Sequence, residues 1–265
     1  MVSYQIKTLA KKYVPGFIVG ALKGIRHRYY TMKGFNHAVA QKGEADFWRQ
    51  FVRSDENFRK LVESDSWKKD ERFDYPLYTH SRMRYFFRNP ESYEEFCKKN
   101  RETRCFEIGS GAVGDLVMMP WVKERIVIDP LLDVYRKTQL DSFGKTLFNE
   151  DIQSYSQEAE VFIPFLENSI SGFIFCTNTL DHCADPWLVL ENISRYAQPG
   201  CMLLLWTDLW HLEGLNAEHR NITKDRDMFE RRLLDLGFQI ERSFSDVRQD
   251  SSTIEYGCVA VKTSA

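Results

Sequence analysis

From Arg104 onward, short and almost uninterrupted apolar runs alternate with longer amphipathic stretches, and this pattern constrains the fold most. Four of these runs are predicted to be strands: 104–109, 125–130, 171–177 and 201–207. The runs are apolar at nearly every position, so we expect strands that are covered on both faces, as in a parallel sheet. Strands that alternate with helices predict an α/β, doubly wound domain over residues 101–265.

Two helices and a hairpin complete the predicted domain. Asp185 and Pro186 supply an N-cap and a first-turn proline for one helix. A second helix is expected over 223–236, where a glycine follows. Two further predicted strands, 238–247 and 254–263, flank the polar turn 248–252 and predict an antiparallel hairpin at the end of the sheet.

Residues 1–100 are predicted to be a helical extension that is rich in aromatic residues. One helix is expected over 44–62, because Phe47, Phe51 and Phe58 recur at helical spacing. Such a stripe is typical of a packing face. The extension is therefore expected either to pack on the sheet domain or to cover a ligand pocket as a lid.

The charge of the chain is divided unevenly. Residues 1–43 hold eight Lys or Arg and no acid, whereas residues 44–265 hold 28 bases and 38 acids. A basic arm of this kind favours an anionic partner, such as lipid headgroups or a phosphorylated substrate. The alternative is a helix face that is only solvated.

The six cysteines form no Cys-x-x-Cys pair, which argues against a zinc or redox motif. We interpret them as buried free thiols in a cytoplasmic protein, with membrane association through the arm left open. The basic residues before the short apolar stretch 14–22 also outline a signal peptide, which we consider the weaker interpretation. No apolar run reaches the roughly 18–20 residues of a membrane helix.

The sharpest local motif is Glu107-Ile-Gly109-Ser-Gly111-Ala-Val-Gly114, which follows the first predicted strand. Glycines let the backbone turn tightly and approach a ligand closely. The second strand ends in Asp129, 20 residues after Gly109, where a carboxylate can accept hydrogen bonds from a ribose. A helix is expected to open after the loop, near 115–121. The loop by itself indicates a nucleoside-containing cofactor.

With Asp129 and five further segments, the loop resembles the class I S-adenosylmethionine (SAM)-dependent methyltransferases, in their small-molecule and glycan branch, over about residues 104–240. The later motifs of the family are matched in order by Glu158-Ala159-Glu160, Ile163-Pro164-Phe165, Asn168-Ser169-Ile170-Ser171, Leu180-Asp181-His182 and Asp185-Pro186. Val113 and Ser171 depart from the usual Gly and Asp. The resemblance implies a Rossmann-like, mostly parallel seven-stranded sheet with a C-terminal antiparallel hairpin, SAM as cofactor, and methyl transfer.

The resemblance also implies which residues bind the cofactor: Glu107, Gly109, Ser110, Gly111, Asp129, Pro130, Glu158, Ala159 and Asn178. An acid such as Glu107 suits a cofactor that carries an ammonium and a sulfonium, and disfavours an anionic pyrophosphate. Each position has a structural alternative. Glu107 and Asp129 could cap helices, Glu158 could be a solvated loop acid, and Asn178 could be a turn residue.

Methyl transfer requires alignment of the acceptor and, for a hydroxyl acceptor, a base. The candidates are His182, His211 and His219. No metal is predicted, because the histidines and nearby acids lack tight ligand spacing. The expected acceptor is a small molecule, a sugar or a lipid-linked glycan. Nucleic acid is not expected as the acceptor. DNA amino-methyltransferases carry an Asn-Pro-Pro-aromatic signature, whereas Asn178 is followed here by Thr-Leu-Asp.

Two other functions remain open at this point. One is a nicotinamide-dependent oxidoreductase or epimerase, because the glycine loop and its acid fit a dinucleotide as well. Glu107 and the absence of a Tyr-x-x-x-Lys pair after the fourth strand count against it. The other is a methyltransferase-like subunit that binds a partner without catalysis.

Overall fold

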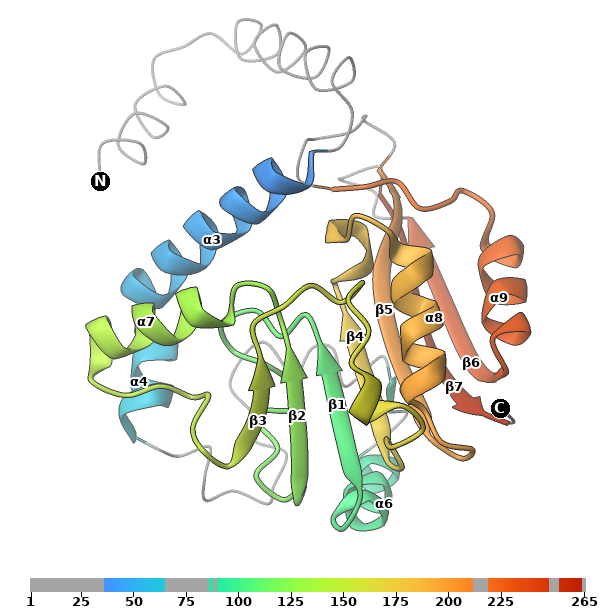
Figure 1. The fold of residues 1–265 in the computed structure, drawn as a ribbon, viewed down its shortest axis with the longest axis horizontal. Helices are drawn as coiled ribbons and strands as arrows, with labels where there is room; N and C mark the ends of the chain where they lie inside the picture. Colours follow the sequence, from blue (N-terminus) through green and yellow to red (C-terminus); the bar gives the residue numbers. More distant parts are fainter. Residues whose placement is uncertain (1–35, 65–85, 88–89, 212–218, 248–252, 264–265) are drawn as a thin grey trace, which may run out of the picture.

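The computed structural model describes residues 36–64, 86–87, 90–211, 219–247 and 253–263. Within them, seven strands form one sheet in the order β3-β2-β1-β4-β5-β7-β6 (Figure 1). The strands are β1 (Arg104–Ile108), β2 (Glu124–Ile128), β3 (Ile152–Tyr155), β4 (Phe173–Thr177), β5 (Met202–His211), β6 (Phe238–Val247) and β7 (Thr253–Lys262).

The first five strands are parallel, as their apolar sequences predict. β1 lies between β2 and β4, with Phe106 opposite Ile126 on one side and Ile174 on the other. The final strand, β7, runs antiparallel to both β5 and β6 and fits between them. The Rossmann-like sheet with a C-terminal antiparallel hairpin is therefore confirmed. The sequence interpretation did not identify β3, and β5 extends to His211.

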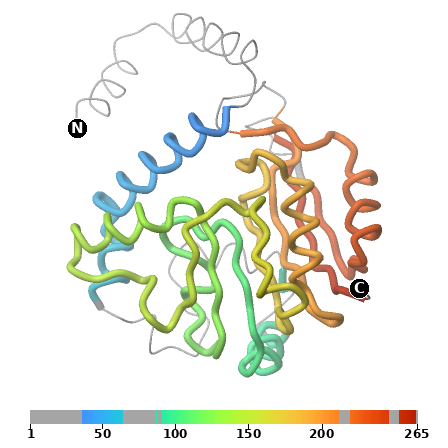
Figure 2. Tube along the Cα trace, viewed as in Figure 1, coloured from blue at the N-terminus to red at the C-terminus, as the bar shows by residue number. Residues whose placement is uncertain are grey.

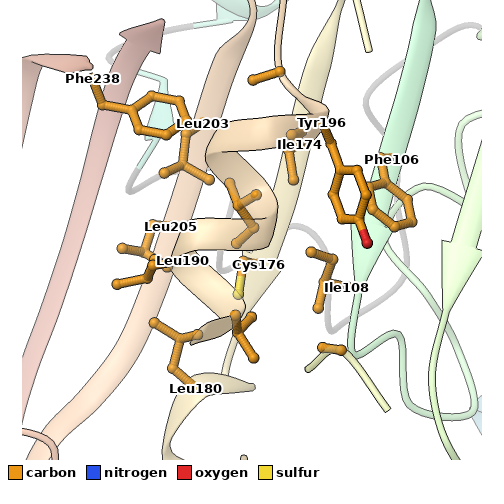
Figure 3. Packing of buried hydrophobic residues seen from close by; sticks show 14 of the residues in the cluster. Phe106, Ile108, Ile174, Cys176, Leu180, Leu190, Tyr196, Leu203, Leu205 and Phe238 are labelled. Carbon is orange, nitrogen blue, oxygen red and sulfur yellow. The ribbon is translucent and has the colours of Figure 1, made fainter. Parts of the chain in front are cut away.

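Helix α8 (Pro186–Tyr196) covers one face of the sheet, and α9 (Arg226–Asp235) lies beside it. Asp185 caps α8 by accepting hydrogen bonds from the backbone N–H groups of Trp187 and Leu188. Figure 3 shows Leu190 of α8 among residues of β1, β4 and β5. Burial of these apolar side chains is the main term that holds α8 on the sheet.

The N-terminal part contains helices α3 (His37–Ser54), α4 (Glu56–Ser64) and α6 (Pro90–Asn100). The single helix predicted over 44–62 is thus two helices, because Asp55 ends α3 and accepts a hydrogen bond from the Phe58 N–H. Phe58 is buried, whereas Phe47 is 53% exposed and is not on the packing face.

The helices of this N-terminal part share hydrophobic cores with the sheet domain. The C-terminal part of helix α3 meets α7 (Leu132–Phe143), and Figure 2 shows these distant segments of the chain next to each other there. Trp48 of α3 packs edge-on against Tyr135 of α7, with ring centroids 6.2 Å apart. On the other side, Phe96 of α6 packs against Phe173 of β4. A boundary near residue 100 stays a prediction.

The helix predicted near 115–121 does not form; this segment is a series of turns. The Glu107 carboxylate accepts hydrogen bonds from the backbone N–H groups of Asp115 and Leu116 and holds the segment against β1. Pro120 also interrupts any helix there.

Seven of the eight bases of the predicted arm fall within residues 1–35, outside the described residues. Among the described helices, none is both long and apolar enough to span a bilayer.

Candidate active site

A pocket lies at the edge of the sheet where β1, β2 and β4 end. Helix α3, one residue of α7 and the loops that follow β1, β2, β3 and β4 line it. Its described lining is His37, Ala40, Gln41, Glu44, Trp48, Gly109, Ser110, Gly111, Val113, Gly114, Asp115, Ile128, Asp129, Pro130, Leu131, Tyr135, Glu158, Ala159, Glu160, Thr177, Asn178, Thr179, His182 and Cys183. This is the edge at which open parallel sheets bind ligands.

The glycine loop (residues 109–114) needs glycine for two reasons. Gly109 and Gly111 have φ of +72° and +58°, a region that side chains disfavour. A Cβ on Gly109 would also lie 2.2 Å from Thr179 Oγ1, and one on Gly111 would lie 2.6 Å from the Trp48 ring. The loop is therefore held closely between β4 and α3.

Asp129 follows β2 and faces the glycine loop. Its carboxylate accepts hydrogen bonds from the N–H groups of Gly111, at 3.0 Å, and Leu131, at 2.8 Å. Burial raises the pKa of Asp129 to about 6, against the opposing effect of these two hydrogen bonds. A buried carboxylate of this kind gains from a ligand that donates further hydrogen bonds.

Glu107 is not part of the described lining of the pocket and lies behind the glycine loop, in contact with the segment that follows it. It is buried, and both carboxylate oxygens accept backbone hydrogen bonds from the segment after the loop. The structure thus shows a role for Glu107 in shaping the loop. A Cβ on Gly114 would stand 3.2 Å from its Oε2.

The rim of the pocket joins the sheet domain to α3. Glu158 accepts a hydrogen bond from Gln41 Nε2 at 3.2 Å, and His37 Nδ1 lies 3.6 Å from the same Glu158 oxygen. At the opposite side, Asn178 follows β4 with φ of +54°, so it is a turn residue that also lines the pocket. Helix α3 therefore covers the site that the loops form.

The charge of the pocket is strongly one-sided. Five of its described lining residues are acids: Glu44, Asp115, Asp129, Glu158 and Glu160. The same lining contains no Lys or Arg. Such a pocket attracts a cationic ligand and repels an anionic one.

The three predicted histidines converge on one carboxylate. Asp181, in the 3-10 turn Leu180–His182 after β4, is fully buried. Its Oδ2 lies 2.7 Å from His219 Nδ1, 3.7 Å from His182 Nε2 and 3.8 Å from His211 Nε2. Burial opposes its ionisation, but the three imidazoles hold the pKa of Asp181 well below its usual range. We call these four residues the histidine cluster.

The structure brings most of the predicted site residues together. Eight of the nine predicted cofactor residues line the pocket, and Glu107 supports them from below. Of the histidines, the described lining includes His182 but neither His211 nor His219, which lie behind it with ring centroids 4.8 Å apart.

Sequence reasoning missed the contributions of α3 and of Thr179. No local motif marks His37, Gln41, Glu44 or Trp48, because only the packing of α3 brings them to the loops. Asp181 lay within a matched motif, and its place before His182 was the available signal.

No family model and no curated protein matches the chain. Among solved structures, the chain is similar to the N-methyltransferase NodS of Bradyrhizobium japonicum in complex with S-adenosyl-L-homocysteine, with 11% identity and a TM-score of 0.51. That match covers 82% of this chain and 98% of NodS. A complex between the Trm112 methyltransferase activator and a methyltransferase of Haloferax volcanii matches with 14% identity and a TM-score of 0.50, over 84% of this chain and 97% of the matched chain. At these identities the likeness concerns the fold: the chain has the fold of the class I SAM-dependent methyltransferases.

Proposed function

We propose that the protein is a SAM-dependent methyltransferase that acts on a small-molecule or glycan acceptor. The observation that carries the proposal is the acidic pocket at the glycine loop, which has five acids and no Lys or Arg in its described lining. SAM carries a sulfonium and an ammonium, which suit this charge. The pyrophosphate of a nicotinamide dinucleotide would instead face acids without a compensating cation, which disfavours the oxidoreductase alternative.

The pocket would hold SAM through residues that the sequence already indicated. Asp129 would accept hydrogen bonds from the ribose hydroxyls, because its buried carboxylate retains acceptor capacity. Glu158 and Ala159 would lie beside the adenine, and Gly109, Ser110, Gly111, Pro130 and Asn178 would line the rest of the cofactor. Glu107 would act indirectly, by fixing the loop.

The acceptor would enter beside His182, the member of the histidine cluster that lines the pocket. Methyl transfer from a sulfonium depends chiefly on alignment of the two reacting atoms. The cluster would position the acceptor or take up its proton, with His211 and His219 acting through their contacts with Asp181 and His182. The proposal does not specify whether an oxygen or a nitrogen atom of the acceptor receives the methyl group.

Calorimetry with SAM and with NAD tests the proposal. We expect the wild-type protein to bind SAM and not NAD. Gly109→Arg should abolish SAM binding, because even its Cβ would stand 2.2 Å from Thr179 Oγ1 and would force the loop to shift. Gly144→Arg is the matched control: Gly144 has a similar φ of +70° and ends α7, and a Cβ on it would meet no other atom within 4 Å.

Binding of NAD without SAM would contradict the proposal, as would a folded Gly109→Arg protein that still binds SAM. Binding of SAM without methyl transfer to any member of a panel of sugar, phenol and amine acceptors would favour the alternative of a non-catalytic binding subunit.

A further inference from the structure

The geometry of the histidine cluster is not that of an ordinary hydrogen-bonded network. Only His219 is within hydrogen-bonding distance of Asp181 Oδ2, at 2.7 Å. The His182 and His211 nitrogens face the same oxygen at 3.7 and 3.8 Å, too far for a hydrogen bond. Neither His182 Nε2 nor His211 Nε2 has a hydrogen-bond partner among the described residues, although both atoms are buried. Buried nitrogens left unpaired are unfavourable, and a bound ion would satisfy them.

We propose that Asp181, His182 and His219 bind a divalent transition-metal ion. Their ligand atoms all lie within 4.8 Å of one another. With metal–ligand bonds of about 2.0–2.2 Å, two ligand atoms on one ion stand about 3–4 Å apart. His182 Nε2 and Asp181 Oδ2, at 3.7 Å, are within this range, whereas His219 Nδ1 and Asp181 Oδ2, at 2.7 Å, would have to separate when an ion enters. Two imidazoles and one carboxylate suit ions of the Zn, Fe(II) or Co(II) type better than Mg or Ca.

One hydrogen bond anchors the carboxylate of Asp181 and another anchors its backbone. Thr207 Oγ1 donates to Asp181 Oδ1 at 3.3 Å, and the Arg220 N–H donates to the Asp181 carbonyl at 2.6 Å. These contacts leave Oδ2 directed toward the imidazoles. Hydrogen bonds that orient a ligand in this way are a regular feature of metal sites.

A second set of ligands adjoins the first. Asp181, Asp208 and His211 also bring their ligand atoms within 4.8 Å, and His211 Nε2 lies 3.8 Å from Asp208 Oδ2. We assign the ion to the set with His182, because His182 lines the pocket and the ion would then face the acceptor. His211 and Asp208 would lie beside the ion, and the carboxylate of Asp208 would help to compensate its positive charge.

The role of the ion in catalysis rests on the proposed function, whereas the test of metal binding does not. A cation next to the acceptor hydroxyl would lower the pKa of that hydroxyl and hold it in position. The residues of the histidine cluster come from three segments that are separated in the sequence, after β4, at the end of β5 and after 212–218. The sequence analysis predicted no metal because these residues are not closely spaced along the chain. That criterion does not apply to ligands that the fold brings together from separate segments.

Titration of the metal-free full-length protein with Co²⁺, followed by visible absorption, tests the site. We expect one equivalent to bind with the spectrum of nitrogen and oxygen ligands. His182→Ala and His219→Ala should each weaken binding by about 100-fold or more. His37→Ala is the matched control and should leave the affinity unchanged, because His37 lines the same pocket but contacts Glu158. Asp208→Asn should weaken binding by less than either histidine variant if the assigned set is correct.

The proposal is overturned if the folded wild-type protein binds no Co²⁺, or if His182→Ala and His219→Ala bind it as the wild type does. Intense thiolate charge-transfer absorption would also overturn it, because it would place the ion on a cysteine. Asp129→Ala separates the two proposals: it should lose SAM binding and keep Co²⁺ binding. Cobalt binding by a wild-type protein that does not bind SAM would reject the proposed function alone.

Discussion

The carboxylate of Asp129 is buried, and the backbone hydrogen bonds that it accepts only partly offset the cost of burying its negative charge. Two backbone N–H groups reach its carboxylate, yet burial still raises its pKa to about 6. Above this pH the group is ionised and accepts hydrogen bonds. Below it, the group carries a proton and offers less acceptor capacity.

SAM affinity should therefore fall as the pH decreases below about 6. The ionised form is the one that accepts the ribose hydrogen bonds, and its population decreases about tenfold for each further pH unit. Calorimetry between about pH 4.5 and 8 measures the effect, with circular dichroism as a check on folding. Asp129→Asn should bind more weakly and lose this pH dependence; an unchanged pH profile in that variant would assign the dependence to another group.

Helix α3 completes the pocket from outside the sheet. Trp48 is buried, donates a hydrogen bond to Glu44 at 2.6 Å, and packs against Gly111 and Tyr135. Its neighbour Phe47, on the same helix, is 53% exposed. Two adjacent aromatic residues thus have very different environments.

Trp48→Ala should lower the free energy of unfolding by about 3–5 kcal/mol, because it removes a buried aromatic side chain. It should also weaken SAM binding, since α3 would no longer be held against the glycine loop. Phe47→Ala is the control and should change stability by less than about 1 kcal/mol. Denaturant unfolding and calorimetry measure both quantities. Equal effects of the two substitutions would show that α3 is not held through Trp48.

The sequence predicts elements best where local pattern and tertiary packing agree. The apolar strands and the capped helix at Asp185 formed as predicted, because a strand covered on both faces must be apolar throughout. The helix over 115–121 failed because Pro120 has no N–H to donate and its ring clashes with the preceding turn. The continuous helix over 44–62 failed because Asp55 is an N-cap, which the aromatic spacing obscured.

The same distinction applies to the site. The glycine loop and Asp129 could be predicted because the motif is local and its parts lie at the ends of adjacent strands. The covering by α3 and the grouping of three histidines around Asp181 could not. Both depend on contacts between segments that only the finished fold brings together.

At the scale of the whole molecule, the basic arm is the feature that the described residues do not explain. Residues 1–34 hold seven bases and no acid, and α3 begins only at His37. Deletion of residues 1–34 should therefore leave the pocket intact. An acidic body with a basic arm suits an enzyme that works near an anionic surface.

The deletion should lower binding to phosphatidylserine vesicles at low salt by at least about 100-fold. Each basic residue near such a surface contributes up to about 1 kcal/mol before screening. Vesicle sedimentation measures the binding, and unchanged SAM affinity is the control for folding. Vesicle binding that survives the deletion would remove the membrane hypothesis.

The position of β7 between β5 and β6 has a consequence for synthesis on the ribosome. β5 emerges first and its outer edge stays unpaired until Thr253–Lys262 follows, after β6. An unpaired strand edge can pair with other chains. The nascent protein should therefore depend on chaperones most strongly in the interval between the emergence of β5 and that of β7.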